Sequence, residues 1–398
     1  GVKPLYYYDG GSFFIVVSEL HLLFCDVRVR KKPNLGMVAE YLAAEIVTRE
    51  QTLYDGIWRL APGHTLTVQL GLVGVSHYWN PDLRSILHYS TDHEYVDQLI
   101  EIIEIRAQQI KVKSIETFST VFPGENCDET SYIELVNDFW NGNSNLVERW
   151  IAPPEHYIDH AKFYQDCPDS PNGAMNTPLK ERVNSKNIRV LLTGCGGDEW
   201  FWGRNSLYAD LIRTFRFREL MNLFLAGEGS LRRKAKTLLR YGLLPLLPAR
   251  GQNLLRRLAD RRRRAFDWIT PDLLRDSCLE DRINAPRSED VFFASLDQEE
   301  VYRVGTNAWM ASNAEIEDLT SMRFCIEQRH PLWDRRIIEY ALVLPGSLRW
   351  YPPYHKQILR QAASGLLPES VRWRQDKTLF NSVFPKALEM QGGVKRMG

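Results

Sequence analysis

A glycine-rich stretch followed by two acidic residues is the part of the sequence best suited to chemistry. In LLTGCGGDEWFWG, residues 191–203, an apolar strand runs into small residues and then into Asp198 and Glu199. A strand that ends in small residues and opens a helix gathers backbone N–H groups where an anion can bind, and glycine lets a phosphate approach without a Cβ in the way. A following carboxylate can serve the Mg²⁺ that phosphates carry. The stretch therefore fits a nucleotide phosphate site.

The same residues also fit a purely structural turn. The helix dipole stabilises acidic residues in the first turn of a helix, so Asp198 and Glu199 are expected there even without a ligand. The spacing alone leaves both interpretations open.

Two regions with different patterns of predicted secondary structure have to position this loop. Residues 1–80 alternate strand-like pieces at 12–17 and 65–70 with a helical stretch at 35–46, which predicts an α+β domain. A polar run at 81–91 predicts a linker.

From residue 92 the pattern changes to helices that alternate with short β-rich runs. The clearest runs are SIETFSTVF at 114–122 and IRVLLTG at 188–194. Strand, helix and strand in this order imply parallel pairing. The sequence therefore predicts an α/β sheet covered on both faces, followed by a largely helical part.

Six segments, in the same order, resemble the asparagine synthetase family and cover most of the chain. The resemblance implies that residues 1–80 are the C-terminal half of a class II glutaminase domain of the N-terminal nucleophile type. It implies that residues 92–398 are a synthetase domain on an adenine-nucleotide α-hydrolase-like parallel sheet. The segments are GVKPLYYY with VVSELHLLF, GIWRLAPGHTL with HYWNP, SIETFSTVFPGENCDETSYI, TGCGGDEWFWG, SMRFCIEQRHPLWDRRIIEYALVLP and HKQILRQAASGLLPESVRWRQDKTLF.

The resemblance also implies a site for ATP, with Mg²⁺ as the second cofactor. The residues that would line the ATP site are Thr120, Thr193, Gly194, Gly196 and Gly197.

The remaining site residues carried over from the family are charged. Asp198 would meet Mg²⁺ and pyrophosphate, and Glu327, in a Glu-x-Arg-x-Pro segment, would lie near the reacting carboxyl group. Lys377 would face the α-phosphate, and Lys356 is a further candidate for that role. A fixed cation and a metal would stabilise the negative charge that adenylation builds. From the residues alone, Glu327 fits an ion pair with Arg323, and Lys377 fits a surface lysine.

The family's reaction implies the substrates. A small-molecule carboxylate, aspartate in the commonest form, attacks the α-phosphorus of ATP to give an acyl-adenylate and pyrophosphate, and ammonia from glutamine then displaces AMP. Divergent relatives include peptide macrocyclases and β-lactam-forming synthetases, and GGDEW with PDSPNG at 168–173 is closer to these. A non-catalytic remnant or a truncated gene model is the third interpretation. A homo-oligomer is compatible with all three.

The chain departs from the family pattern in its glutaminase part. The family uses an N-terminal cysteine as nucleophile, with its own amino group as base. Residue 1 is glycine here, and Cys25 lies inside a mid-domain match without a free amine. We expect that the first half of this domain has been lost or is not included.

The second departure concerns the ATP site. The family's Ser-Gly-Gly-x-Asp-Ser loop should follow the first strand of the synthetase sheet, but no glycine lies between Gly74 and Gly124. No close phosphate cradle can form there. In a doubly wound sheet this strand is central, so its loss leaves neighbouring strands with unpaired backbone groups and uncovered apolar faces. We expect a chain less stable than a complete relative and impaired in adenylation.

Composition limits the partners and the compartment. Fifty basic residues balance fifty acidic ones, so no overall field recruits nucleic acid or an anionic membrane, and any such contact has to be local. Six cysteines without a CxxC pair favour reduced thiols and a cytoplasmic location. No apolar run approaches the ~20 residues of a membrane span, and the N-terminus lacks the zones of a signal peptide.

Three further features allow two interpretations each. The basic run at 231–264, with Asp260 as its one acid, fits a solvated helical hairpin or a docking face for an acidic partner or membrane surface. His156 and His160 have a spacing that could bind zinc on a helix, but without a third ligand an ordinary polar surface is favoured. The small size of Cys195 is enough to explain its place in the glycine-rich loop. Its thiol would be reactive only if its surroundings were electropositive.

Overall fold

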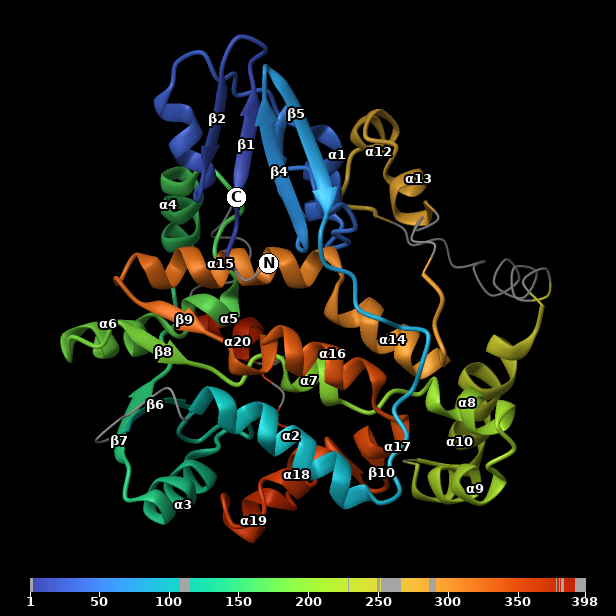
Figure 1. The fold of residues 1–398 in the computed structure, drawn as a ribbon. Helices are drawn as coiled ribbons and strands as arrows, with labels where there is room; N and C mark the ends of the chain where they lie inside the picture. Colours follow the sequence, from blue (N-terminus) through green and yellow to red (C-terminus); the bar gives the residue numbers. More distant parts are fainter. Residues whose placement is uncertain are drawn as a thin grey trace.

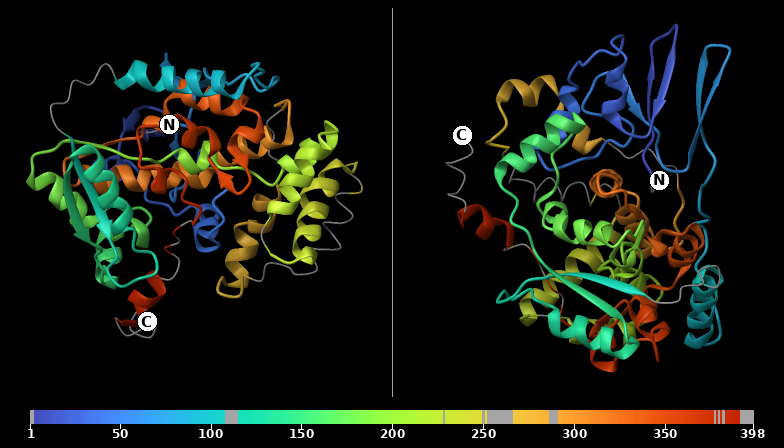
Figure 2. Two further views of the ribbon diagram at one scale, coloured as in Figure 1. Left: turned by 90° about the horizontal axis from the view of Figure 1, so that it is seen from below. Right: turned by 90° about the vertical axis from the view of Figure 1, so that its left-hand side faces the viewer.

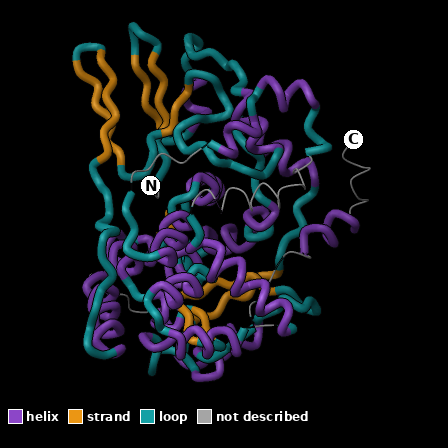
Figure 3. The backbone as a smooth tube through the Cα atoms, turned by 90° about the vertical axis from the view of Figure 1, so that its right-hand side faces the viewer, coloured by secondary structure: helices purple, strands orange, loops and turns teal. Residues whose placement is uncertain are grey.

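The computed structural model describes residues 3–107, 115–227, 229–248, 251, 266–285, 291–376, 378, 380 and 383–390. Within these residues the strands form five separate small sheets and most of the rest is helical. Figure 1 shows the N-terminal strands at one end of the molecule, on the far side of helix α15 (Ala308–Met322) from the parallel strands. Figure 3 shows the same separation, with helices between the two groups of strands.

The N-terminal region is a small α+β unit. Strand β1 (Tyr6–Asp9) lies between β2 (Phe14–Val17) and β3 (Ile57–Arg59) in an antiparallel sheet, with Tyr6 opposite both Val17 and Arg59. The core of the unit is made by Tyr6, Leu20, Leu23, Val29 and Ile57. The other elements are the 3₁₀ helix η1 (Leu20–Cys25), α1 (Leu35–Leu42) and the hairpin of β4 (His64–Gln69) and β5 (Leu72–His77).

The strands and the helix predicted in residues 1–80 are found. The predicted strands at 12–17 and 65–70 correspond to β2 and β4, and the predicted helix at 35–46 corresponds to α1. A buried ion pair joins this unit to the rest of the chain, because Arg59 Nε on β3 lies 2.6 Å from Glu315 Oε1 on α15.

The parallel strands form two pairs instead of the one sheet expected from the sequence. Strand β6 (Glu116–Val121) pairs with β7 (Asn143–Glu148), and β8 (Val190–Leu192) pairs with β9 (Glu327–Arg329), both in parallel. No backbone ladder joins the two pairs in the described part of the chain. The α/β character and the parallel pairing were therefore predicted correctly, whereas the described residues do not confirm a continuous nucleotide-binding sheet.

Apolar side chains along these strands are uncovered. Val190 and Leu192 lie on the same face of β8, and Leu192 is 54% exposed. Leu146 on β7 and Ile115, just before β6, are also exposed. Strands in the middle of an α/β sheet are normally buried on both faces. These apolar side chains are therefore less covered than those of a complete α/β sheet.

Helices build the largest core. Helix α2 (Asp92–Ala107) packs against α16 (Arg335–Val343) and α18 (Gln357–Ala362), and α7 (Gly197–Phe201) packs against α14 (Leu296–Gly305). The buried side chains that they share include Leu99, Trp200, Phe201, Val301, Ile337, Leu342 and Ile358.

The remaining helices and the short hairpin lie around this core or, as α4, α12 and α13 do, against the N-terminal unit (Figures 1 and 2). They are α3 (Thr130–Trp140), α4 (Pro154–Tyr164), α5 (Pro171–Ala174), α6 (Thr177–Ser185), α8 (Leu207–Arg213), α9 (Phe217–Ala226), α10 (Leu231–Thr237), η2 (Leu238–Leu243), η3 (Leu244–Leu246), α12 (Pro271–Asp276), α13 (Leu279–Asn284), η4 (Pro331–Trp333), α17 (Gly346–Arg349), β10 (Trp350–Tyr351), β11 (Tyr354–His355), α19 (Glu369–Arg372) and α20 (Val383–Met390).

A fully buried ion pair holds this core together. Arg349 Nη1 lies 2.6 Å from Asp297 Oδ2, and the same guanidinium donates hydrogen bonds to the backbone carbonyls of Trp200, Ala341 and Leu344. Burial raises the pKa of Asp297 to about 6, and the charge of Arg349 opposes the rise.

Replacing Arg349 by methionine should destabilise the fold strongly. Arg349→Met leaves a buried carboxylate without its counter-ion, which costs about 3–5 kcal/mol of unfolding free energy. Because loss of Arg349 raises the pKa of Asp297 further, the stability linked to this group is fully present only below the pKa of an unfolded aspartate and is lost as the pH rises from there through the raised folded pKa. Urea denaturation should therefore give a larger loss at pH ~8 than at pH ~5. The control Arg275→Met, whose ion pair with Asp272 is exposed, should shift stability by less than about 0.5 kcal/mol. Equal losses in the two variants would contradict the assignment.

Candidate active site

The glycine-rich loop joins the end of β8 to α7 and packs against the chain that follows β9. Gly196 has a φ of +105°, and a Cβ on it would lie 2.9 Å from Leu332 Cβ and 3.0 Å from the Leu332 backbone. Only glycine fits this left-handed position and this close approach. A Cβ on Gly194, in contrast, would meet no atom within 4 Å. The loop is therefore packed on its Gly196 side and open on its Gly194 side.

Three backbone N–H groups of the loop are satisfied within the loop itself. The N–H of Cys195 donates to Thr193 Oγ1 at 3.3 Å, and the N–H of Gly197 donates to the Gly194 carbonyl at 3.3 Å. The N–H of Gly196 donates to Glu199 Oε2 at 2.8 Å. Glu199 thus caps α7 in the way that the structural interpretation of the sequence predicts. An anion at these groups would have to replace the internal acceptors.

A charge pair lies at the start of α7. Lys356 Nζ lies 2.7 Å from Asp198 Oδ1, and both side chains are partly exposed. Lys356 immediately precedes α18 in a left-handed conformation, with a φ of +56°, and its Nζ lies 5.7 Å from the centre of the Trp202 ring. The structure therefore brings Asp198, Lys356 and the glycine loop together, although Lys356 is far away in sequence.

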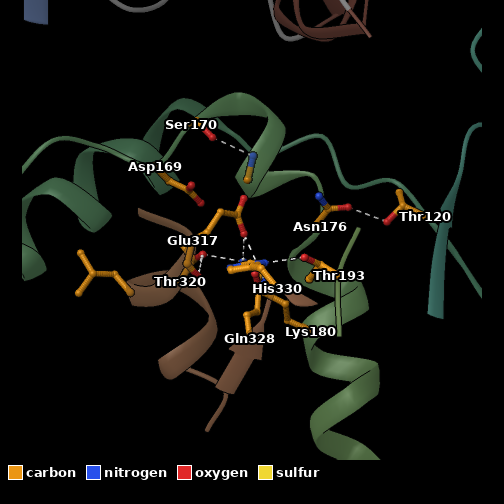
Figure 4. Close-up of polar contacts among 12 residues, drawn as sticks. Thr120, Asp169, Ser170, Asn176, Lys180, Thr193, Glu317, Thr320, Gln328 and His330 are labelled. Carbon is orange, nitrogen blue, oxygen red and sulfur yellow. Dashed lines mark hydrogen bonds and ion pairs between the residues drawn. The ribbon is translucent and has the colours of Figure 1, made fainter. Parts of the chain in front are cut away.

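A histidine that the sequence did not single out faces the loop. Thr193 Oγ1 lies 2.6 Å from His330 Nδ1, as Figure 4 shows. The two residues directly follow the paired strands β8 and β9, and the Thr193 N–H donates to the Arg329 carbonyl at 3.0 Å. Burial lowers the pKa of His330, although the charge of Glu317 opposes this. Parallel pairing of the two segments is the signal that could have placed His330 here.

Thr120 lies near the end of β6 and forms its hydrogen bond with a residue outside the glycine loop. Its Oγ1 donates to Asn176 Oδ1 at 2.7 Å (Figure 4). Among the described residues Thr120 has no hydrogen bond to the glycine loop. Asn176, which the sequence did not single out, lies between α5 and α6.

Glu327 lies at the amino end of β9. It stands opposite Val190, whereas the loop follows the carboxyl end of β8. Its carboxylate accepts two hydrogen bonds from Arg329, each at 3.0 Å, and these lower its pKa. The ion pair is thus made with Arg329 instead of Arg323. Lys377 lies outside the described residues.

A buried polar cluster holds β9, the strand that His330 directly follows. Lys180 Nζ on α6 donates to Thr320 Oγ1 at 2.5 Å and lies 3.3 Å from Glu317 Oε2 on α15. Gln328 Nε2 on β9 donates to the same Glu317 oxygen at 3.4 Å (Figure 4). The cluster ties β9 to α6 and α15.

Family comparisons identify the chain. A model described as asparagine synthase matches residues 102–396, and a model described as a glutamine amidotransferase domain matches residues 1–79. The chain belongs to the asparagine synthase family.

Individual relatives agree with this assignment. The chain is 26% identical over 247 residues to a protein provisionally named as glutamine-hydrolysing asparagine synthetase 2 of Methanocaldococcus jannaschii, covering 54% of this chain and 48% of that protein. It is 21% identical over 409 residues to asparagine synthetase 1 of Bacillus subtilis (93% and 62%) and 19% identical over 413 residues to asparagine synthetase 3 of that organism (97% and 64%). The chain spans between about half and just under two thirds of the length of these relatives.

The other candidate residues of this family member are accounted for by packing. His156 Nε2 lies 3.3 Å from Asp169 Oδ2, and burial lowers the pKa of His160 to about 4. In the described part of the chain, no three histidine, cysteine or acidic side chains gather as they would around a metal ion. Burial and the charge of Glu199 raise the pKa of Cys195, so its thiol is not activated. Among the same residues, every helix is too short or too polar to span a bilayer.

The two glycines of the loop should respond differently to alanine. Gly196→Ala forces a Cβ into Leu332 at a strained φ and should lower the free energy of unfolding by about 2 kcal/mol or more. Gly194→Ala adds a Cβ in open space and should change it by less than about 1 kcal/mol. Urea denaturation of both variants measures the difference. Equal effects would show that the loop does not have this conformation.

His330 should titrate below its ordinary value of 6.5. Burial disfavours the imidazolium ion, so the stability linked to His330 is present above that value and is lost as the pH falls through its lowered folded pKa. An NMR titration of the ring resonances, assigned by their loss in His330→Gln, gives the folded pKa directly. A midpoint at or above the ordinary value would contradict the buried placement beside Thr193.

Proposed function

We propose that this chain is an asparagine synthetase-type amide ligase polypeptide that keeps the pyrophosphate end of the ATP site but is impaired in adenylation. The observation that carries the proposal is the Asp198–Lys356 pair, 2.7 Å apart, beside the open side of a glycine loop at the carboxyl end of a parallel strand. The carboxyl ends of parallel strands are where α/β proteins bind ligands.

The residues present suit Mg²⁺ and pyrophosphate. The space beside Gly194 is open, and Gly197 has only ordinary contacts, with Lys356 Nζ 3.6 Å from the position of its Cβ. Asp198 is an oxygen ligand of the kind Mg²⁺ takes, with phosphate oxygens and water completing its shell. Lys356 would exchange its contact with Asp198 for phosphate oxygens. When bound, Mg²⁺ would neutralise charge on the phosphates.

The chain's own residues would act on a carboxylate and ATP. Attack of a carboxylate oxygen on the α-phosphorus forms one P–O bond and breaks the bond to pyrophosphate, and ammonia then displaces AMP from the acyl carbon. Lys356 is the described lysine that contacts the loop carboxylate, and its fixed charge would stabilise the departing pyrophosphate. We further propose the roles that the resemblance implies for two residues: Glu327 near the reacting carboxyl group and Lys377 facing the α-phosphate. Thr120 keeps its proposed place on the ATP wall.

Two observations support impairment of the first step. No glycine lies between Gly74 and Gly124, so the family's second phosphate loop is missing from this chain. Among the described residues, no ladder joins the pairs β6–β7 and β8–β9, as expected if the strand from which that loop would start is missing. The proposed site would therefore bind only the pyrophosphate end of ATP.

The substrates follow from the family. We propose aspartate as the carboxylate and glutamine as the source of ammonia, as in the relatives named asparagine synthetase. A relative that activates another carboxylate, such as a macrocyclase or a β-lactam-forming synthetase, would use the same residues. The six cysteines are all free, which supports a cytoplasmic location.

Lys356 should matter for pyrophosphate binding. Lys356→Met should weaken the binding of magnesium pyrophosphate roughly 10- to 100-fold, because it removes a charged hydrogen-bond donor. Isothermal titration calorimetry measures the affinity. The matched control is Lys186→Met, since Lys186 is 33% exposed in an ion pair with Glu116 while Lys356 is 32% exposed. Equal affinities in both variants would rule out the proposed site.

Adenylation should be weak or absent. The purified chain, with aspartate, ATP and Mg²⁺, should give little or no exchange of labelled pyrophosphate into ATP. Exchange at the rate of a complete ligase would show that the chain does not need the missing loop. Binding of pyrophosphate without exchange is the combined result that the proposal expects.

A further inference from the structure

A helical lobe at the edge of the molecule carries an exposed apolar surface. Helices α8, α9 and α10, with η2, lie together away from the parallel strands, as Figures 1 and 2 show. The inner side of the lobe has its own small core, made by Leu207, Tyr208, Leu211 and Leu223. The apolar side chains on its outer side are therefore not needed to hold the lobe together.

The outer apolar side chains are spaced as stripes. On α9, Phe217, Met221 and Leu225 occur at every fourth residue and all three are exposed, Leu225 to 63%. Residues four apart share one face of a helix. Water-exposed apolar stripes of this length are unfavourable unless another surface covers them.

The next helix repeats the pattern. Leu231, Leu239 and Leu243 on α10 and η2 are exposed to 71%, 60% and 48%, and exposed Ala235 fills the fourth place in the series. The Lys234 side chain donates to the Leu225 carbonyl at 2.5 Å, which joins the end of α9 to the start of this helix.

Cations run beside the second stripe. Arg232, Lys236 and Arg240 each follow a stripe residue by one position and are exposed. None of the three has a carboxylate partner among the described residues. Residues 211–248 hold eight basic residues and two acidic ones, although the whole chain is neutral. The lobe therefore carries a local positive charge next to its apolar stripes.

We propose that this basic-apolar face binds the surface of an anionic lipid bilayer. The face consists of Leu231, Arg232, Lys236, Leu239, Arg240 and Leu243 on α10 and η2, and the exposed stripe of α9 adds apolar surface to the same lobe. A helix with leucines on one side and basic residues beside them lies in the headgroup region, with its apolar side chains among the acyl chains. No described helix spans a membrane, so this contact is peripheral.

The charges favour a bilayer over the other occupants. A second copy of the chain would bring Arg232, Lys236 and Arg240 against a face that carries the same cations, and like charges in contact are repulsive. An acidic soluble chain without apolar side chains, such as poly-L-glutamate, would satisfy the cations but leave the leucines in water. An anionic bilayer satisfies both groups of side chains.

Vesicle sedimentation of the full chain tests the proposal. The wild-type chain should sediment with vesicles of phosphatidylcholine and phosphatidylserine and stay in solution with phosphatidylcholine alone. Arg232→Gln/Lys236→Gln/Arg240→Gln should weaken partitioning roughly 100-fold, since each basic residue near an anionic surface contributes about a factor of five. Leu239→Gln/Leu243→Gln should weaken it roughly tenfold or more.

Matched controls keep the test independent of folding. Arg30→Gln/Lys31→Gln/Arg84→Gln removes the same charge from exposed sites elsewhere, and Leu70→Gln/Leu72→Gln removes two exposed leucines from the β4–β5 turn. Both should bind like the wild type, and all variants should have the same circular dichroism spectrum.

Three results would overturn the proposal. The first is no sedimentation of the wild-type chain, or equal sedimentation with neutral vesicles. The second is equally tight binding to soluble poly-L-glutamate that does not depend on Leu239 and Leu243. The third is a dimer in lipid-free buffer that Leu239→Gln/Leu243→Gln dissociates.

Discussion

The parallel pairing of β8 with β9 determines where the glycine loop lies. A strand has two hydrogen-bonding edges, and the N–H groups of alternate residues point to opposite edges. Strand β8 is paired on one edge, to β9, through contacts that run from the Glu327 N–H to the Arg189 carbonyl (2.7 Å) and from the Thr193 N–H to the Arg329 carbonyl (3.0 Å). These bonds set where β8 ends. The glycine loop starts at that point, so its position follows from one strand pair.

The helical core explains why the glycine loop, Asp198 and Lys356 lie together although no described strand joins the two parallel pairs. Trp200 and Phe201 anchor α7, and Ile358 anchors α18, in the same buried cluster. Asp198 and Lys356 lie at the adjoining ends of these two helices and are therefore held together by helix packing. On the other side, Gly196 lets the loop rest against Leu332. Neither contact depends on β6 or on a strand beside it.

The sequence was most informative about local features. The acidic first turn of α7 was predicted from residue types, because the helix dipole acts within a few residues. The parallel pairs were predicted from the alternation of strands and helices. Strand pairing between distant segments is a long-range property, so the sequence predicted one sheet and not the division of the described strands into two pairs.

The sequence analysis did not predict contacts between residues that are far apart in the chain. Thr193 and His330 are 137 positions apart and meet only because β8 and β9 pair. Lys180 and Glu317 are 137 positions apart and meet only because the fold brings α6 beside α15. Glu327 was expected to contact a helical neighbour, but it lies on a strand, where residues two apart share a face, so Arg329 is its partner.

Residue-resolved hydrogen exchange of β8 tests the central claim, that this strand, which pairs only with β9 among the described residues, has a free edge beside the glycine loop. The Thr193 N–H donates to Arg329 and should be protected, whereas the Leu192 N–H points to the other edge and should exchange at least roughly tenfold faster. Equal protection of the two amides would mean that a second strand pairs with β8, and the account of a half-built site would be wrong.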